Sequence, residues 1–286
     1  DLEGILSLAK AASSSPVGRE RNGGVHPKVG SDNPPQAETA EGEGGEEPKP
    51  RIGVFRDSAF QLNSLERPTA RIGVFRDEAF QFYYPENLEQ LERMGARLVE
   101  INAISQQGLP PLDALYIGGG FPEIQAQALS DNHTFRNALR NEIEKGLPVY
   151  AECGGFMYLG KNLVVDGKTY PMVGAIPLGF VLNKRPQGHG YTVLEVKKTN
   201  PYYRVGEILK GHEFHYARPV LTGDQNMDFV FKVSRGHGVD GKREGICQKN
   251  VLATFTHIHA AGNPIWAKGL FNVASKYRRS DSRKNG

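Results

Sequence analysis

Short apolar segments alternate with helix-like segments from residue 71 onward. The strand-like segments LVEI, ALYIGG, PVYAE and VLATFTHIH are rich in Val, Leu, Ile and Tyr. The helix-like segments cover residues 85–95, 123–129 and 134–145. Strands and helices that alternate in this way bury their apolar faces best as an α/β fold, with a mainly parallel sheet flanked by helices. Between Tyr170 and Arg218, short strands punctuated by Gly and Pro predict an insertion or an antiparallel edge.

The first 50 residues have a different character. Residues 1–12, DLEGILSLAKAA, follow the pattern of an amphipathic helix, and we expect the chain to be part of a longer polypeptide. Residues 13–50 are dominated by Ser, Gly, Pro and Glu and contain almost no aliphatic side chains at regular spacing. This composition predicts a disordered linker, because too little apolar surface is available to offset the entropy of ordering the chain.

A near-identical repeat follows the linker. Residues 51–61 (RIGVFRDSAFQ) and residues 71–81 (RIGVFRDEAFQ) differ at one position. Because a solenoid needs longer units and usually three of them, we interpret residues 51–70 as a local duplication. Only the second copy continues into a helix-like segment, so it is predicted to form the first strand. The folded domain is expected to span residues 71–275, with a basic tail at 276–286.

Composition excludes several classes of protein. With 286 residues and 38% hydrophobic side chains, the chain can bury a sizeable core. Its net charge of +3 is small, and no basic stripe with interleaved aromatic residues indicates nucleic acid as a partner. No apolar run approaches the roughly 18 residues of a membrane span, and the start lacks the pattern of a signal peptide. We therefore expect a cytoplasmic protein without nucleic-acid or membrane partners.

One of the two cysteines has informative neighbours. Residues 148–160, PVYAECGGFMYLG, place a buried-type strand directly before Cys153 and an apolar helix directly after it. This order predicts a sharp strand-to-helix turn, in which the residues two positions on either side must be small; in this chain they are Ala151 and Gly155. The helix start favours a thiolate, and the N–H of Gly154 lies where an oxyanion would form. The alternative is that Cys153 is an ordinary buried cysteine.

The same segment nearly matches a phosphate-binding loop. Residues 155–162, GFMYLGKN, follow the pattern G-x-x-x-x-G-K-[ST] except that Asn162 replaces the hydroxyl residue that holds magnesium. The large apolar side chains inside the segment are typical of a packed helix. Nucleotide binding is therefore not expected at this segment, and the two cysteines also lack the spacing of metal ligands.

A cysteine nucleophile needs a nearby base, which is usually a histidine. His257 follows the apolar run VLATFT and is expected at the end of a late strand, on the same sheet edge as Cys153. His259 would face the opposite side if that strand continues. The histidines that we expect to be structural or on the surface are His133, His189, His212, His215 and His237. Zinc binding is a weaker alternative, because no carboxylate or cysteine has a matching spacing.

Glycines follow a second strand-like segment in YIGGGFPE. Gly118, Gly119 and Gly120 come directly after Leu115 to Ile117. Backbone without side chains at that sheet edge can bring N–H groups close to a substrate. Together with the Cys153 turn, Gly119 and Gly120 are candidates for the second half of an oxyanion hole.

These ordered motifs resemble the C-terminal glutaminase domain of the cobyrinic acid a,c-diamide synthase family. The resemblance covers residues 71–274 and includes RIGVFRDEAFQFYYPENL, ALYIGGGFPE, AECGGFMYLG, GHGYTVLEV, GHEFHYARP and VLATFTHIHAAGNPIWA. It implies a class I glutamine amidotransferase-like (flavodoxin-like) fold. It also implies that Cys153 is the nucleophile, that His257 raises its nucleophilicity, and that oxyanion donors lie around Gly119 and Gly154.

The resemblance further implies a place in cobalamin biosynthesis as a glutamine-hydrolysing carbon–nitrogen ligase. Such enzymes normally begin with a domain that uses ATP and Mg²⁺ to activate the acetate side chains of cobyrinate or hydrogenobyrinate. The resemblance implies that the helix at 1–12 is the remnant of this upstream ATP-binding domain. No cofactor is expected within these 286 residues, and glutamine is the expected substrate. A homodimer is an open alternative.

Two functions remain open from the sequence. In the first, the chain is an enzyme that forms a thioester with glutamine and releases ammonia. In the second, it is a non-catalytic module that docks on an ATP-dependent amidating domain. Cys153 and His257 favour the enzyme. The third member of a triad is unassigned, with Glu213 as a guess.

Overall fold

The computed structural model describes residues 70–221 and 227–282. The predicted helix at 1–12, the linker at 13–50 and the first repeat copy lie outside the described residues. The second repeat copy forms the first strand, β1 (Ala70–Phe75), as its continuation into a helix predicts.

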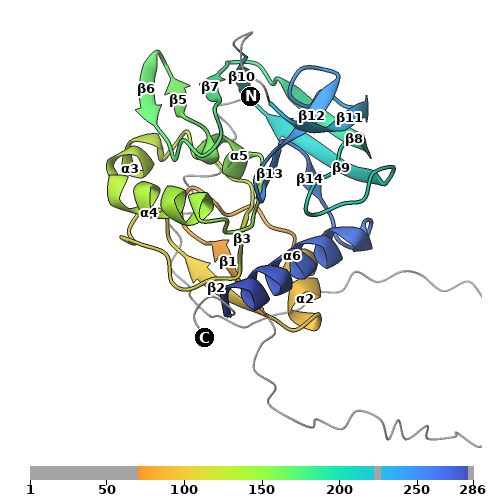
Figure 1. The fold of residues 1–286 in the computed structure, drawn as a ribbon. Coiled ribbons are helices and arrows are strands. Elements are labelled where there is room, and N and C mark those ends of the chain that lie inside the picture. Colours follow the sequence, from red (N-terminus) through yellow and green to blue (C-terminus); the bar gives the residue numbers. More distant parts are fainter. Residues whose placement is uncertain (1–69, 222–226, 283–286) are drawn as a thin grey trace, which may run out of the picture. The chain divides into compact units, whose positions relative to one another are not determined.

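A ten-stranded sheet forms the centre of the fold (Figure 1). Its parallel half has the order β2-β1-β3-β4-β13. These strands, besides β1, are β2 (Ala96–Ile101), β3 (Ala114–Ile117), β4 (Val149–Glu152) and β13 (Val251–Thr254). Each residue of β3, β4 and β13 is buried, which is why these strands are continuous apolar runs in the sequence.

The rest of the large sheet is antiparallel and continues from β13 in the order β12-β11-β8-β9-β14. These strands are β12 (Arg243–Gln248), β11 (Phe229–Arg235), β8 (Gly188–Val196), β9 (Ile208–His215) and β14 (His257–Ile258). Although β14 and β3 are far apart in this order, His257 of β14 lies against Gly119 just after β3. The twist of the sheet therefore curls its antiparallel end back over the parallel half.

A smaller four-stranded sheet contains β10 (Ala217–Val220), β7 (Gly179–Leu182), β5 (Asn162–Val165) and β6 (Lys168–Pro171), in that order. Together with β8 and β9, it accounts for the short strands predicted between Tyr170 and Arg218. These strands form both an inserted sheet and the antiparallel extension of the main sheet.

Helices cover both faces of the parallel half (Figure 1). They are α2 (Pro85–Arg93), α3 (Ala126–Asp131), α4 (His133–Glu144), α5 (Gly154–Leu159) and α6 (Pro264–Ser282). Because side chains of a strand alternate between faces, Tyr116 and Ile117 of β3 belong to two separate cores. Ile117 packs in the core with Phe135 of α4, whereas Tyr116 packs in the core with Trp266 of α6. These layers confirm the predicted α/β fold class.

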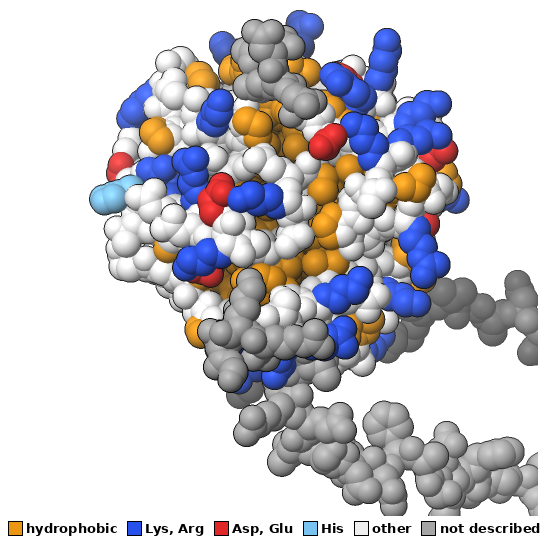
Figure 2. All heavy atoms as spheres, in the orientation of Figure 1, with side chains coloured by type: hydrophobic (Ala, Val, Ile, Leu, Met, Phe, Trp, Pro, Cys, Tyr) orange, Lys and Arg blue, Asp and Glu red, His pale blue; other side chains and the backbone are white. Residues whose placement is uncertain are grey.

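Two predicted boundaries differ from the structure. The segment at 123–129 becomes helical only at Ala126, and α6 continues to Ser282, past the expected domain end at 275. None of the described helices is long and apolar enough to cross a membrane. On the face drawn in Figure 2, Lys and Arg are the commoner charges and lie scattered around apolar side chains rather than in one stripe.

The predicted strand VLATFTHIH is not continuous. It ends at Thr254, and β14 begins at His257. The N–H of Phe255 donates to the buried carboxylate of Glu244 (3.1 Å), and the N–H of Thr256 donates to the Thr254 hydroxyl (3.0 Å). At these two residues, side-chain acceptors thus replace the backbone hydrogen bonds between strands, and the chain bends before His257.

Candidate active site

Cys153 lies at the turn between β4 and α5 and has the strained backbone of a nucleophile elbow. Its φ of 47° and ψ of −100° are unusual for a residue other than glycine. The backbone N–H of Cys153 donates to the carbonyl of Thr254 on the neighbouring strand (2.7 Å), which holds the turn against β13. The side chain stands at the carboxyl end of the parallel strands, where the sequence predicts it.

The small residues beside this turn have a packing reason. A Cβ on Gly155 would lie 2.7 Å from both the carbonyl oxygen and the Cγ2 atom of Ile117. Ala151, two residues before Cys153, is fully buried in the core below the sheet edge. A larger side chain at either position would push α5 away from β3, and the turn would open.

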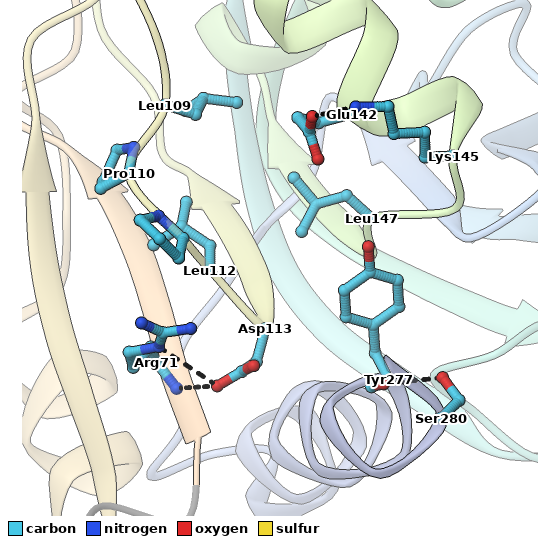
Figure 3. A pocket seen from close by; sticks show the side chains of 11 residues that line it. Arg71, Leu109, Pro110, Leu112, Asp113, Glu142, Lys145, Leu147, Tyr277 and Ser280 are labelled. Atoms are coloured by element: carbon cyan, nitrogen blue, oxygen red, sulfur yellow. Dashed lines mark hydrogen bonds and ion pairs between the residues drawn. The ribbon is translucent and has the colours of Figure 1, made fainter. Parts of the chain in front are cut away.

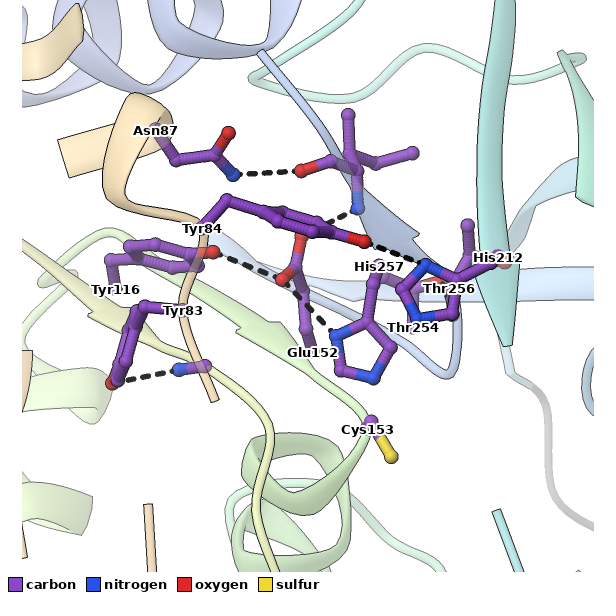
Figure 4. A network of polar contacts seen from close by, with 12 residues as sticks. Tyr83, Tyr84, Asn87, Tyr116, Glu152, Cys153, His212, Thr254, Thr256 and His257 are labelled. Atoms are coloured by element: carbon purple, nitrogen blue, oxygen red, sulfur yellow. Dashed lines mark hydrogen bonds and ion pairs between the residues drawn. The ribbon is translucent and has the colours of Figure 1, made fainter. Parts of the chain in front are cut away.

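His257 lies beside Cys153, and both side chains are nearly inaccessible to solvent, with exposed fractions of 4% and 5% (Figure 4). The imidazole is held between two rings. Its centroid is 4.9 Å from the nearly parallel ring of His212 and 4.8 Å from the ring of Phe82, which meets it edge-on. These contacts restrict the orientation of the His257 ring.

The charge state of His257 follows from its neighbours. Burial opposes a charge on the ring, but the adjacent Cys153 thiol and Glu152 carboxylate outweigh it and raise the pKa of His257 from 6.5 to about 10. Burial and the charge of His257 lower the pKa of His212 to about 4, so His212 is neutral at pH 7. A thiol beside a protonated imidazole is the arrangement that activates a cysteine nucleophile.

Glu152, directly before Cys153, supplies the carboxylate nearest to His257 (Figure 4). Its Oε2 atom lies 3.6 Å from Nδ1 of His257, and its Oε1 atom accepts the N–H of Ile258 (3.1 Å). The sequence left the third residue unassigned, with Glu213 as a guess, and the structure places Glu213 beside other partners. The Glu213 carboxylate accepts the N–H groups of His237 and Gly238 on the far side of β9. The sequence does contain a sign of Glu152's importance, because it is the one charged residue in the otherwise apolar segment PVYAE.

The segment that carries His257 is anchored by α2. The side chain of Asn87 donates to the carbonyl of Ile258 (2.7 Å) and accepts the N–H of Ala260 (2.7 Å), and it is fully buried. Tyr84, just before α2, contacts the Nδ1 atom of His212 through its hydroxyl (2.8 Å). Sequence analysis missed both residues, because their partners come from distant parts of the chain.

The glycine loop after β3 differs in part from the prediction. The N–H of Gly119 donates to the carbonyl of Phe82 (3.1 Å), so it is already engaged. The N–H groups of Gly120 and Gly154 donate to no other residue in the described part of the chain. These two glycines adjoin, because a Cβ on Gly154 would lie 3.1 Å from the Gly120 nitrogen. Of the two candidates after β3, Gly120 is thus the one whose N–H is unengaged within the described residues.

His259 is directed away from Cys153. Its Nε2 atom lies 3.5 Å from the Glu86 carboxylate, and its ring packs 4.5 Å from that of Tyr84. His215 is buried on the opposite face of β9 from His212 and stacks on Phe255 at 3.8 Å. Of the histidines in the described residues, His257 and His212 are therefore the two whose rings lie together at the Cys153 turn.

The near-match to a phosphate loop does not form such a loop in the structure. The GFMYLGKN segment begins in α5, whose residues are all buried, so its N–H groups cannot surround a phosphate. The same part of the chain contains no cluster of three or more His, Cys, Asp or Glu side chains suited to a metal ion. The described residues thus do not fit ATP with magnesium at this position.

A pocket of about 610 Å³ lies away from the candidate site (Figure 3). Its lining includes Arg71 at the start of β1, Asp113 before β3 and Leu147 before β4. These positions are at the amino ends of the parallel strands, whereas Cys153 follows a carboxyl end. Ligands of open α/β sheets bind at the carboxyl ends, so pocket size does not locate the active site in this fold.

Gly119→Ala is expected to reduce roughly 10²-fold the glutamine hydrolysis that the family resemblance implies. A Cβ at this position would lie 2.4 Å from Cε1 of His257, and the ring cannot retreat easily because Phe82 and His212 enclose it. Steady-state rates of glutamate release measure the effect. Gly108→Ala is the matched control, since nothing lies within 4 Å of a Cβ there. Equal activities of the two variants would contradict this packing argument.

Comparison with known proteins identifies a family and named relatives that the chain resembles. Residues 71–265 match the family described as the CobB/CobQ-like glutamine amidotransferase domain. A cobyrinate a,c-diamide synthase of Archaeoglobus fulgidus is 41% identical over 79% of this chain and 44% of its own length. One of Magnetococcus marinus is 41% identical over 66% of this chain and 40% of its own length. The chain thus spans about two fifths of the length of these curated relatives.

Solved structures share the fold. PurLQS from Thermotoga maritima matches with a TM-score of 0.55 at 16% identity, covering 73% of this chain and 98% of that chain. A structure described as a glutamine amidotransferase matches with a TM-score of 0.52 at 21% identity, covering 71% and 98% of the two chains. From the family match over most of the described residues, together with this fold, the chain belongs to the CobB/CobQ-like glutamine amidotransferase family.

Proposed function

We propose that this chain hydrolyses glutamine through a thioester on Cys153. The observation that carries the proposal is the strained Cys153 turn beside a buried imidazole whose pKa is raised. Strain of this kind persists where the surrounding structure holds a reactive group in position. An ordinary buried cysteine would need neither the unusual backbone nor the adjacent imidazole.

The reaction begins with attack of the Cys153 thiolate on the side-chain amide carbon of glutamine. The oxyanion that forms accepts hydrogen bonds from the N–H groups of Gly120 and Gly154. His257 then gives its proton to the leaving nitrogen, the C–N bond breaks, and ammonia departs.

Water completes the cycle. Neutral His257 takes a proton from water as the water oxygen attacks the γ-glutamyl thioester. The C–S bond breaks, glutamate leaves, and the Cys153 thiolate and protonated His257 are restored. Each proton taken up by the imidazole is thus returned within one turnover.

The second part of the proposal concerns the use of the ammonia. The relatives are named cobyrinate a,c-diamide synthases, and this chain matches less than half of their length. By that similarity, the ammonia would amidate the a and c acetate side chains of cobyrinate or hydrogenobyrinate. A separate ATP- and Mg²⁺-dependent domain would activate those carboxylates. The alternative is a module that docks on such a domain without catalysis.

Reconstitution with an ATP-binding domain from a relative tests this part. With cobyrinate, ATP, Mg²⁺ and glutamine labelled with ¹⁵N in its side-chain amide, we expect labelled diamide only when both proteins are present. Mass spectrometry of the corrinoid measures the label. The ATP-binding domain alone should still accept free ammonia, which serves as the control. Diamide formation by this chain alone would contradict the division of roles, and full transfer by the Cys153→Ala variant would favour the docking module.

A further inference from the structure

Glu152 is an ionisable residue at the end of an apolar strand, and its side chain is almost completely buried, with an exposed residue fraction of 1%. A buried carboxylate is stable only where donors compensate for the lost water. Two donors are present. The Tyr116 hydroxyl donates to Oε2 (3.0 Å), and the backbone N–H of Ile258 donates to Oε1 (3.1 Å). Burial raises the pKa of Tyr116 well above its usual value, so this hydroxyl keeps its proton.

The free side of Oε2 faces His257. The distance from Oε2 to Nδ1 is 3.6 Å, slightly too long for a closed hydrogen bond. Nδ1 is itself buried and has no hydrogen-bond partner in the described residues. A buried ring nitrogen without a partner is unfavourable, so a small shift of the ring would complete the contact with Glu152. Figure 4 shows the other ring nitrogen on the Cys153 side.

We propose that Glu152 is the positioning residue of His257: its carboxylate binds Nδ1–H and thereby directs Nε2 at the Cys153 thiol. The inference rests on the proposed glutamine hydrolysis. The proton moves only between Nε2 and the reacting groups, while Nδ1–H stays bonded to the Glu152 carboxylate. His257 is thereby held between two consecutive residues, the carboxylate before the turn and the nucleophile at the turn.

Alternation along β4 makes this arrangement possible. Glu152 points to the face of the sheet where Tyr116 and the segment after His257 lie, as its two hydrogen bonds show. The titratable groups that face the His257 ring are Glu152 on β4, Cys153 in the turn and His212 on β9. Of these, only Glu152 is an acceptor for Nδ1.

The test compares Glu152→Gln with Glu213→Gln. Both carboxylates have an exposed residue fraction of 1% and accept backbone N–H groups, but Glu213 lies 3.7 Å from His215 and makes no contact with His257. For Glu152→Gln we expect kcat for glutamine to fall roughly 10²-fold with KM nearly unchanged, because Glu152 orients the base without binding substrate. For Glu213→Gln we expect a lower melting temperature without that change in kcat.

A titration of the His257 ring by NMR is the second measurement. Removing the carboxylate should lower the pKa of His257 by at least about 1 in Glu152→Gln, since a nearby opposite charge favours the protonated ring. Glu152→Asp, which keeps the charge, should retain part of the raised value. The His257→Asn variant identifies the signal.

Two outcomes would overturn the inference: an unchanged His257 titration in Glu152→Gln, or the same loss of kcat in Glu213→Gln. If Glu152→Gln does not fold, the wild-type chain still decides, because a bonded Nδ1 proton of His257 should appear downfield and exchange slowly. The absence of that proton would count against the inference. These NMR measurements need no glutamine. If the chain hydrolysed no glutamine, the proposed function would fail, but the effect of Glu152 on the His257 ring could still be measured.

Discussion

Cys153→Ala is expected to lower the rate of glutamine hydrolysis by at least about 10⁴-fold, because no other group in the site can form the thioester. The fold should persist. The side chain loses one sulfur atom, and the backbone bond from residue 153 to the Thr254 carbonyl does not depend on it. Rates of glutamate release and the intact mass of the quenched enzyme, which reveals a γ-glutamyl adduct, measure both parts of the expectation.

Cys247 provides the control for this experiment. It lies half-buried on β12, and burial raises the pKa of its thiol to about 11, so it is not a reactive thiolate at neutral pH. Cys247→Ala should keep the wild-type rate and still form the adduct. Hydrolysis that survives in Cys153→Ala would show that the proposed nucleophile is wrong.

His257→Asn is expected to reduce the rate roughly 10²- to 10⁴-fold, the usual contribution of a general acid–base group. Asparagine fills part of the same space but cannot carry a proton between the thiol and the leaving nitrogen. His259→Asn should change the rate little, because the side chain of His259 faces Glu86 instead of Cys153. If His259→Asn proved the more damaging change, His259 would be the base.

The stability of the fold offers an independent readout for His257. Since its pKa rises from 6.5 to about 10 on folding, the protonated ring stabilises the folded state fully below pH 6.5. That contribution is lost as the pH rises through about 10. The free energy of unfolding of the wild type relative to His257→Asn should therefore decline between these pH values, as urea titrations would measure. A difference that stays constant across this window would contradict the raised pKa.

The motifs around Cys153 could be predicted from sequence because they depend on local constraints. A buried strand, a cysteine between small residues and an apolar helix start lie next to one another in the chain, so their order alone indicates the turn. The apolar runs of β3 and β4 likewise indicate strands buried on both faces. The position of His257 could be predicted for the same reason, because it directly follows the apolar run VLATFT.

The remaining features of the site depend on contacts between segments that are distant in sequence. The charged residue in PVYAE marks Glu152 as unusual, but its contact with His257 follows from the bend at Phe255 and Thr256. That bend in turn needs the Glu244 carboxylate from another strand. Spacing in the sequence thus overestimated the length of the last strand.

The sequence by itself determined the fold class, the position of the Cys153 turn and the strand that precedes His257, since each is encoded within about ten consecutive residues by periodicity and residue size. Only the tertiary structure decided which groups surround the imidazole. The curl of the sheet brings His212 of β9 and the Gly119 loop to the same ring. In the folded chain the Gly119 N–H donates to the Phe82 carbonyl, whereas the Gly120 N–H has no acceptor within the described residues. These contacts depend on which groups become buried together and on which distant acceptor each N–H group meets. Neither can be read from the order of residues.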